Sequence, residues 1–240
     1  MHKILISGAS SGLGKYLLSS FKADQYDREA LKPKNNHFPR TGYEIIIHVA
    51  FNMPNNHETE IDYKNSHLKL ADNLLSIPHR KFILISSVDV VKEKVKSNWY
   101  GEAKLDVENL CLQKGTNPII LRCGAMFGPS MRKNQMLKIA LGDNIKLTLA
   151  RSSKFYLISY EDVASLVKKK LVTGKYYLIS KKLVSLSEVA EYFGQMPEWG
   201  SHEYTPPQLD PEIKILYPIT QLSKDPLKWL REFIENNDWK

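Results

Sequence analysis

The sequence predicts an α/β fold, in which a doubly wound parallel sheet carries helices on both of its faces. Short apolar runs alternate with amphipathic segments through the first half of the 240-residue chain. Four runs have the length of buried strands, at residues 3–7, 44–49, 81–86 and 118–122. Helical spacing covers residues 13–21, 59–77 and 99–114, with a weak strand within 21–26. Such alternation is typical of parallel sheets, because each parallel connection needs a crossover, usually a helix.

The pattern loosens after Phe127, where we expect shorter elements. Helices are predicted at 131–141, 161–171 and 187–193, and strands at 155–158 and 176–179. Residues 197–218 are rich in proline and are predicted to be irregular. A final helix is expected to begin at Asp225-Pro226, where a capping carboxylate precedes a proline at the first helical position.

The composition is that of a soluble globular protein with one main core, since 42% of the residues are hydrophobic and 25% are charged. No apolar stretch approaches the length of a membrane span, and no export signal is visible. Cys111 and Cys123 are the only cysteines, so a disulfide framework is not expected. We therefore expect a cytoplasmic protein in a reducing compartment.

The net charge of +8 has three interpretations: an anionic substrate, a nucleic-acid surface or a lysine-rich composition. The lysine clusters at 92–96, 168–170 and 181–182 are short and are not interleaved with aromatic residues that could stack on bases. They are interpreted as solvated faces. The expected partner is a small molecule, with neither nucleic acid nor membrane.

A glycine-rich turn follows the first predicted strand. It reads Ser7-Gly8-Ala9-Ser10-Ser11-Gly12-Leu13-Gly14. Glycines let the backbone approach a pyrophosphate at the N-terminus of the next helix, where N–H groups and the helix dipole favour negative charge. Alone, the motif fits an ordinary loop as well; the strand before it and the helix after it indicate a Rossmann-like dinucleotide site. The predicted cofactor contacts are Gly8, Ser10, Ser11, Gly12, Leu13 and Gly14.

A tyrosine and a lysine four residues apart, Tyr100 and Lys104, lie on the helix predicted after the strand that ends in Ser86-Ser87. On a helix they would sit one turn apart, about 6 Å along the axis. At an effective dielectric of ~20, the ammonium would stabilise a phenolate by ~3 kcal/mol, or about two pKa units. Tyr100 would then be a general acid or base. The alternative is a surface pair on an amphipathic helix.

Five further segments follow in a fixed order. They are Ile46-Ile47-His48-Val49-Ala50, Asn65-Ser66-His67-Leu68, Phe82-Ile83-Leu84-Ile85-Ser86-Ser87, Leu121-Arg122-Cys123-Gly124-Ala125-Met126-Phe127-Gly128-Pro129 and Ser159-Tyr160-Glu161-Asp162-Val163-Ala164. With the glycine-rich turn and the Tyr100–Lys104 pair, they resemble the short-chain dehydrogenase/reductase superfamily. The resemblance covers most of the chain and is greatest to the extended branch of nucleotide-sugar epimerases, dehydratases and reductases.

The resemblance implies a role for each matching residue. Tyr100 would exchange a proton with the sugar oxygen, Ser87 would hydrogen-bond the same oxygen, and Asn65 would support the site from the neighbouring helix. Lys104 would bind the nicotinamide ribose and lower the tyrosine pKa, and Ala50 would line the cofactor at its strand end. No metal site is expected. An alternative for the adjacent Ser86-Ser87 hydroxyls is bonding to the backbone at a strand end.

The sequence also departs from the extended branch. Its glycine spacing is closer to the smaller single-domain members of the superfamily. Dehydratases carry an aspartate-glutamate pair after the active-site serine or threonine, whereas here those places hold Val88 and Asp89. We therefore do not expect 4,6-dehydration. The short stretch between Ser87 and Tyr100 and the short C-terminal part predict a substrate pocket unlike that of better-known relatives.

Two charged residues compete for the cofactor ribose, about 20 positions after the first glycine. An acidic residue there selects NAD, and an arginine accommodates the 2′-phosphate of NADP. The chain offers both Asp27 and Arg28, and a strand would turn only one of them to the ribose. We favour NADP(H) over NAD(H) through Arg28. The alternative is a solvent-exposed ion pair in a loop.

The resulting hypothesis is a Rossmann-like core with a small C-terminal substrate-binding subdomain. Residues 1–128 and about 155–182 would form the core, and about 129–154 and 183–240 the subdomain. The expected activity is NADPH-dependent reduction of a keto group on a nucleotide-linked deoxysugar. The alternatives are an NAD-dependent nucleotide-sugar epimerase, a non-catalytic dinucleotide sensor and, third, a nucleic-acid-binding protein. Helices 59–77 and 99–114 are the candidate face of a homodimer.

Overall fold

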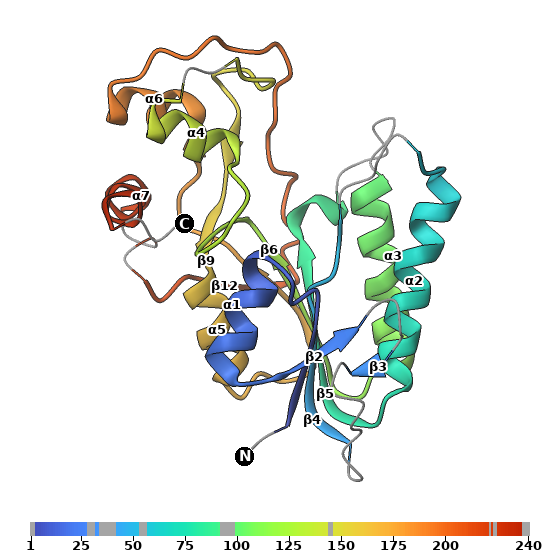
Figure 1. Ribbon diagram of the computed structural model, residues 1–240. Helices are drawn as coiled ribbons and strands as arrows, with labels where there is room; N and C mark the ends of the chain where they lie inside the picture. Colours follow the sequence, from blue (N-terminus) through green and yellow to red (C-terminus); the bar gives the residue numbers. More distant parts are fainter. Residues whose placement is uncertain are drawn as a thin grey trace.

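The computed structural model describes residues 3–27, 32–33, 42–52, 57–91, 99–143, 146–220, 222 and 225–236. Its centre is an eight-stranded sheet in the order β12-β10-β6-β5-β4-β1-β2-β3 (Figure 1). The strands are β1 (Ile4–Ser7), β2 (Asp24–Asp27), β3 (Lys32–Pro33), β4 (Tyr43–His48), β5 (His79–Ser87), β6 (Pro118–Cys123), β10 (Gly174–Leu178) and β12 (Lys214–Leu216). Neighbouring strands are parallel, except that β2 and β3 pair antiparallel at one edge.

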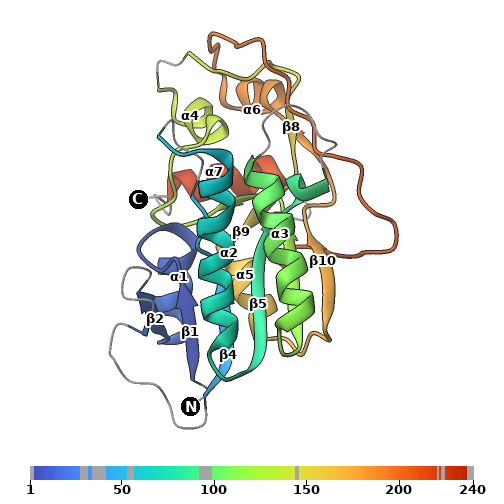
Figure 2. The same ribbon diagram turned by 90° about the vertical axis from the view of Figure 1, so that its right-hand side faces the viewer.

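Helices cover both faces of this sheet (Figures 1 and 2). On one face lie α1 (Gly12–Phe21) and α5 (Tyr160–Lys168), and on the other α2 (Glu60–Ser76) and α3 (Trp99–Lys114). The strand side chains alternate between the two layers: Ile4 and Ile6 belong to the core with α1 and α5, and Leu5 to the core with α2 and α3. The α/β fold class predicted from the sequence is therefore confirmed.

A second group of elements lies beyond the carboxyl edge of the sheet (Figure 1). It contains α4 (Gln135–Leu141), α6 (Leu186–Phe193), α7 (Pro226–Glu235) and the antiparallel pair β8 (Lys154–Phe155) with β11 (Val184–Ser185). These helices share an apolar cluster that includes Phe127, Leu186 and Leu230. The parallel pair β7 (Ala125–Phe127) and β9 (Leu157–Ser159) joins this group to the sheet. The domain boundaries that the sequence suggests stay a prediction.

Several predicted elements differ from the structure. Helix α4 begins at Gln135, because the Asn134 side chain accepts a hydrogen bond from the Leu137 N–H and caps it. The strand expected at 155–158 is divided at Tyr156 into β8 and β9, which pair with different partners. Within the proline-rich segment, β12 adds an edge strand beside β10.

A buried polar cluster connects α3 with the centre of the sheet. The Arg122 guanidinium on β6 pairs with the Glu108 carboxylate on α3, with Nη2–Oε2 and Nε–Oε1 distances of 2.7 and 3.0 Å. The Ser86 hydroxyl donates to Glu108 Oε1 at 2.6 Å. All three side chains are buried. The Ser86 hydroxyl therefore links β5 to α3. Ser87, the last residue of β5, makes no contact with this cluster among the hydrogen bonds described.

Candidate dinucleotide and catalytic site

The candidate site begins where the winding of the sheet changes direction, between β1 and β4. In open α/β sheets, ligands bind outside the carboxyl ends of the strands at such a point. The Ser7 hydroxyl lies 2.7 Å from His48 Nδ1 and accepts the Val49 N–H at 3.3 Å. These contacts join the two strand ends and hold Val49 beside the glycine-rich turn.

Two glycines in the turn are required by close backbone approach. A Cβ added at Gly14 would lie 2.0 Å from the Gly8 carbonyl oxygen, so α1 can begin beneath the turn only without a side chain there. Gly8 has a φ of +75°, and a Cβ on it would lie 2.7 Å from the Ala50 nitrogen. The turn therefore packs directly on the end of β4 and presents its backbone to the space above.

A cavity of about 730 Å³ opens above this turn. Within the described residues, the Ser11 side chain makes no capping hydrogen bond to α1, and the backbone of Leu13 in the first turn hydrogen-bonds to the Tyr160 hydroxyl. From the predicted cofactor set, Gly8, Ser10, Ser11, Gly12, Leu13, Ala50 and Lys104 line the cavity. Gly14 lies beneath Gly8, and Arg28 lies outside the described residues. The cavity and its polar N-terminal wall fit a bound dinucleotide.

Tyr100 and Lys104 lie on the α3 wall of the same cavity. Lys104 Nζ is 5.1 Å from the centre of the Tyr100 ring and 3.8 Å from that of Phe51, and it donates to the Ile85 carbonyl at 3.0 Å. The Lys104 side chain is buried. Helix α3 thus brings the phenol and the amine together one turn apart, as the sequence predicts, and places both beside the 730 Å³ cavity.

The electrostatics of this pair differ from the sequence-based expectation. We expected Lys104 to bring the pKa of Tyr100 toward neutrality, but in the structure that pKa is raised. Burial is the main cause, because it opposes the phenolate, and the Asp89 carboxylate is the next. Burial also lowers the pKa of Lys104 to about 7, so its charge at neutral pH is incomplete. Tyr100 is therefore held as a neutral phenol.

Ser87 belongs to a small polar cluster with Asp89 and Tyr204. The Ser87 hydroxyl donates to Asp89 Oδ2 at 3.2 Å and accepts the Asp89 N–H at 3.2 Å. The Tyr204 hydroxyl donates to Asp89 Oδ1 at 2.9 Å, and its ring stacks on Phe155 at 4.6 Å. Asp89 thus connects Ser87 with the proline-rich segment, although Ser87 does not line the 730 Å³ cavity.

Asn65, predicted to support the site from α2, has an exposed side chain and does not line the 730 Å³ cavity, so its role stays a prediction. The inward face of that helix carries Tyr63 and His67, both fully buried. His67 stacks on Phe51 with ring centres 4.4 Å apart, and Phe51 in turn meets the Tyr100 ring edge-on at 6.3 Å. Residues two apart on a helix point to different sides. On α2, His67 is therefore the side chain that contacts the Tyr100 ring through Phe51.

Asp89, Tyr204 and His67 are the residues of the site that sequence reasoning missed. The apolar spacing of α2 could have indicated His67, because it lies four residues after Tyr63 and three before Leu70 on one helical face. Asp89 and Tyr204 are separated by 115 positions, and Tyr204 lies in a segment without regular structure. No local pattern in the sequence connects them.

Solved structures similar to this chain cover almost its whole length. RMD from Pseudomonas aeruginosa, complexed with NADPH, has a TM-score of 0.66 at 16% identity and covers 96% of this chain and 99% of its own. UDP-glucuronic acid 4-epimerase from Bacillus cereus, in complex with UDP-glucuronic acid and NAD, has 0.67 at 18%, with 98% and 99% covered. The dTDP-glucose 4,6-dehydratase from Bacillus anthracis, in complex with NAD, has 0.63 at 14%, with 100% and 98% covered.

The chain therefore has the fold of the extended short-chain dehydrogenases/reductases, which confirms the resemblance at the level of the fold. No protein-family model matches the sequence, and no curated protein matches it either. None of the described helices combines the length and the apolar character needed to cross a lipid bilayer.

Proposed function

We propose that the protein is an NAD(P)-dependent oxidoreductase that reduces a keto group on a nucleotide-linked sugar with NADPH. One observation carries this proposal: Tyr100 and Lys104 line the same cavity as the glycine-rich turn. A phenol, an amine and a dinucleotide cradle at one cavity are what carbonyl reduction needs. The similar solved enzymes, RMD with NADPH and the epimerase with UDP-glucuronic acid and NAD, support this reaction class and a nucleotide-sugar substrate.

The residues present fit a bound dinucleotide. The glycine-rich turn and the first-turn N–H groups of α1 would hold its pyrophosphate, and Lys104 would bind the nicotinamide ribose. When bound, the reduced nicotinamide supplies a hydride to the carbonyl carbon. Tyr100 donates its proton to the carbonyl oxygen, which becomes the hydroxyl of the product, and the phenolate regains a proton from solvent. Ser87 would orient the same oxygen.

The raised pKa of Tyr100 supports reduction over the alternative, an NAD-dependent epimerase. A neutral phenol is ready to donate a proton to a carbonyl oxygen. An epimerase must first remove a proton from a hydroxyl, which requires the phenolate that burial and Asp89 disfavour. The same tyrosine, serine and lysine could serve either reaction. A non-catalytic dinucleotide sensor is the third candidate, and it would leave the Tyr100–Lys104 pair without a role.

The decisive experiment mixes the purified protein with NADPH and a nucleotide-linked keto-deoxysugar. We expect loss of NADPH fluorescence with one hydroxysugar formed for each NADPH consumed. Tightly retained NAD, with interconversion of two sugar epimers and no net consumption, would instead identify the epimerase. Binding of NADPH without turnover of either substrate class would instead identify a non-catalytic dinucleotide sensor.

Arg28 is the proposed determinant of NADP(H) preference, because β2 ends at the preceding residue, Asp27. If Arg28 binds the 2′-phosphate, Arg28→Ala removes charge-assisted hydrogen bonds of about 1.5–3 kcal/mol. The ratio of the dissociation constants for NADPH and NADH should then move toward NADH by roughly ten- to a hundredfold. Titration of the variant and of the exposed control Arg80→Ala measures this ratio. An unchanged ratio would show that Arg28 does not determine the cofactor preference.

Asp89 is expected to set the pH range of the reaction. Its carboxylate is the largest charge effect that raises the pKa of Tyr100, so Asp89→Asn should lower that pKa. Asp89 also raises the pKa of Lys104. The alkaline limb of the kcat profile, whether it reports loss of the phenol proton or of the ammonium charge, should therefore move to lower pH. The exposed Asp72→Asn is the matched control. A limb that stays in place would show that Asp89 acts on neither Tyr100 nor Lys104.

The division of the chain and its assembly complete the proposal. Residues 129–154 and 183–240 would form the substrate side, and Tyr204 would bring that side into contact with Asp89.

We also propose a homodimer through α2 and α3, whose outer surface exposes Ile61 and Leu112. Both large apolar side chains would lose contact with water in such an interface.

A further inference from the structure

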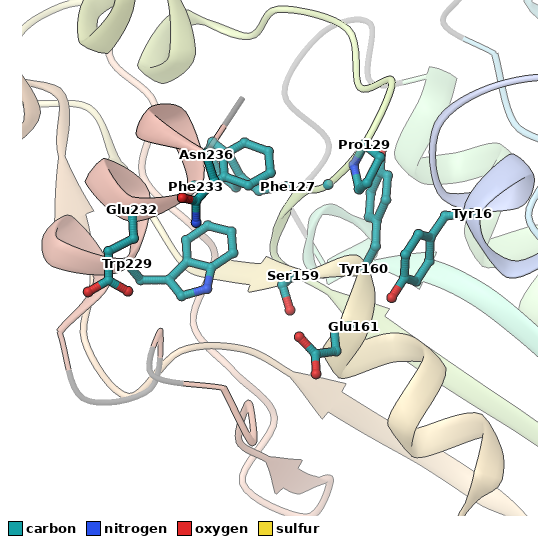
Figure 3. Close-up of a pocket in the computed structure, with 11 residues that line it drawn as sticks. Tyr16, Phe127, Pro129, Ser159, Tyr160, Glu161, Trp229, Glu232, Phe233 and Asn236 are labelled. Carbon is teal, nitrogen blue, oxygen red and sulfur yellow. The ribbon is translucent and has the colours of Figure 1, made fainter. Parts of the chain in front are cut away.

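A second cavity, of about 250 Å³, lies between α7 and the N-terminus of α5. Figure 3 shows Trp229 of α7 on one side of it and Tyr160 and Tyr16 on the other, with Pro129 at one end. Glu161 extends into the opening between the two sides (Figure 3). Among the described residues, only Tyr160 is shared with the lining of the larger cavity, so the two spaces adjoin at that ring and have otherwise different linings.

Aromatic rings form opposite sides of the cavity. On the α7 side, Trp229 stacks on Phe233 with ring centres 5.2 Å apart, and Phe127 meets both rings edge-on. On the other side, the Tyr16 and Tyr160 rings lie 5.8 Å apart. Tyr160, Phe127 and Phe233 are buried, whereas Trp229 and Tyr16 are partly exposed. The three buried rings therefore hold the two partly exposed rings in place. The negative faces of such rings attract cations.

The charged groups of the cavity have one sign. Glu161 and Glu232 line it, and no lysine or arginine does so among the described residues. The ammonium of Lys228, one helical turn from Glu232, is 4.0 Å from its carboxylate at an exposed position and offsets little of its charge. In a chain with a net charge of +8, this cavity is a local negative site. A phosphate or carboxylate ligand would be repelled from it.

We propose that this cavity binds a small organic cation, a quaternary or primary ammonium, between Trp229 and Tyr160. The aromatic faces would contact the alkyl groups that carry the positive charge, and Glu161 and Glu232 would balance that charge at the opening. Aromatic rings and carboxylates together favour a cation over a neutral molecule of the same shape. The proposal is independent of the dinucleotide chemistry assigned to the larger cavity.

Calorimetric titration of the full-length protein with choline tests the proposal, without dinucleotide or sugar nucleotide present. The matched ligand is 3,3-dimethyl-1-butanol, which keeps the shape of choline but has no charge. We expect saturable binding of choline and at least roughly tenfold weaker binding of the neutral analogue. Higher salt should weaken choline binding. Equal affinity for the two ligands, or no saturable binding of choline, would overturn the proposal.

Variants locate the binding on the proposed surface. Glu161→Gln and Glu232→Gln should each weaken choline binding about threefold or more, whereas the exposed α7 control Glu235→Gln should leave it unchanged. Trp229→Leu should weaken choline binding about tenfold. If this substitution, at a ring stacked on Phe233, impairs folding, the two glutamine variants still test the proposal. Unchanged affinity in all three lining variants would place any bound choline elsewhere. Stronger binding of glucose than of choline would show a carbohydrate site instead.

Discussion

Replacing Tyr100 with phenylalanine should lower kcat for NADPH-dependent reduction by roughly 10²- to 10⁴-fold, the usual contribution of a positioned general acid. The substitution removes only the hydroxyl, and the ring can keep its edge-on contact with Phe51 at 6.3 Å. Because the glycine-rich turn is the proposed dinucleotide site, the dissociation constant for NADPH should change by less than about threefold. Steady-state turnover and NADPH titration separate the two effects.

The matched control for this substitution is Tyr217→Phe, which removes a hydroxyl from an exposed tyrosine outside the lining of either cavity. Its turnover should equal that of the unchanged protein. Full activity in Tyr100→Phe would contradict the catalytic assignment. A loss of turnover that is explained entirely by weaker NADPH binding would show that Tyr100 lines the cavity but does not act as the general acid.

Replacing Glu108 with alanine should destabilise the protein by about 3–5 kcal/mol, because it leaves the guanidinium of Arg122 buried without its carboxylate. The Ser86 hydroxyl would lose its acceptor at the same time. Denaturant unfolding measures the change in the free energy of unfolding. The exposed Glu191→Ala on α6 is the control, with an expected change within about 0.5 kcal/mol.

A double variant tests the physical reason for this loss. Glu108→Ala with Arg122→Met removes both charges, so the cost of an unpaired buried cation disappears. The double variant should therefore be more stable than Glu108→Ala alone. If the changes in the free energy of unfolding of the two single variants simply add in the double variant, the loss of stability comes from packing of the Glu108 side chain and not from an unpaired buried charge.

The sheet, its helices and the glycine-rich turn could be predicted from the sequence, because their signals are local. Ile4, Leu5 and Ile6 form a buried run, and its side chains reach both helix layers. Gly8 and Gly14 mark a turn that tolerates no side chain at either position. The pairing of Tyr100 with Lys104 needs only one helical turn. Each of these inferences depends on residues close together in the chain.

The remainder of the site depends on tertiary packing. Asn65 and His67 differ by two positions, and only the packed face of α2 shows which of them points inward. The contact between Asp89 and Tyr204 joins segments 115 residues apart. The pKa of Tyr100 follows mainly from burial and next from Asp89, and the spacing of Tyr100 and Lys104 in the sequence indicates neither. Spacing alone gives neither burial nor distant partners.

Tyr160 has a wider consequence, since its ring is a common wall of the two cavities. The backbone of Leu13, in the glycine-rich turn, hydrogen-bonds to its hydroxyl. Any occupant of the smaller space that shifts this ring would change the affinity of the turn for a dinucleotide. Thermodynamic reciprocity then requires the dinucleotide to change the affinity for that occupant by the same factor. One side chain would thus couple the proposed dinucleotide site to the ligand of the smaller cavity.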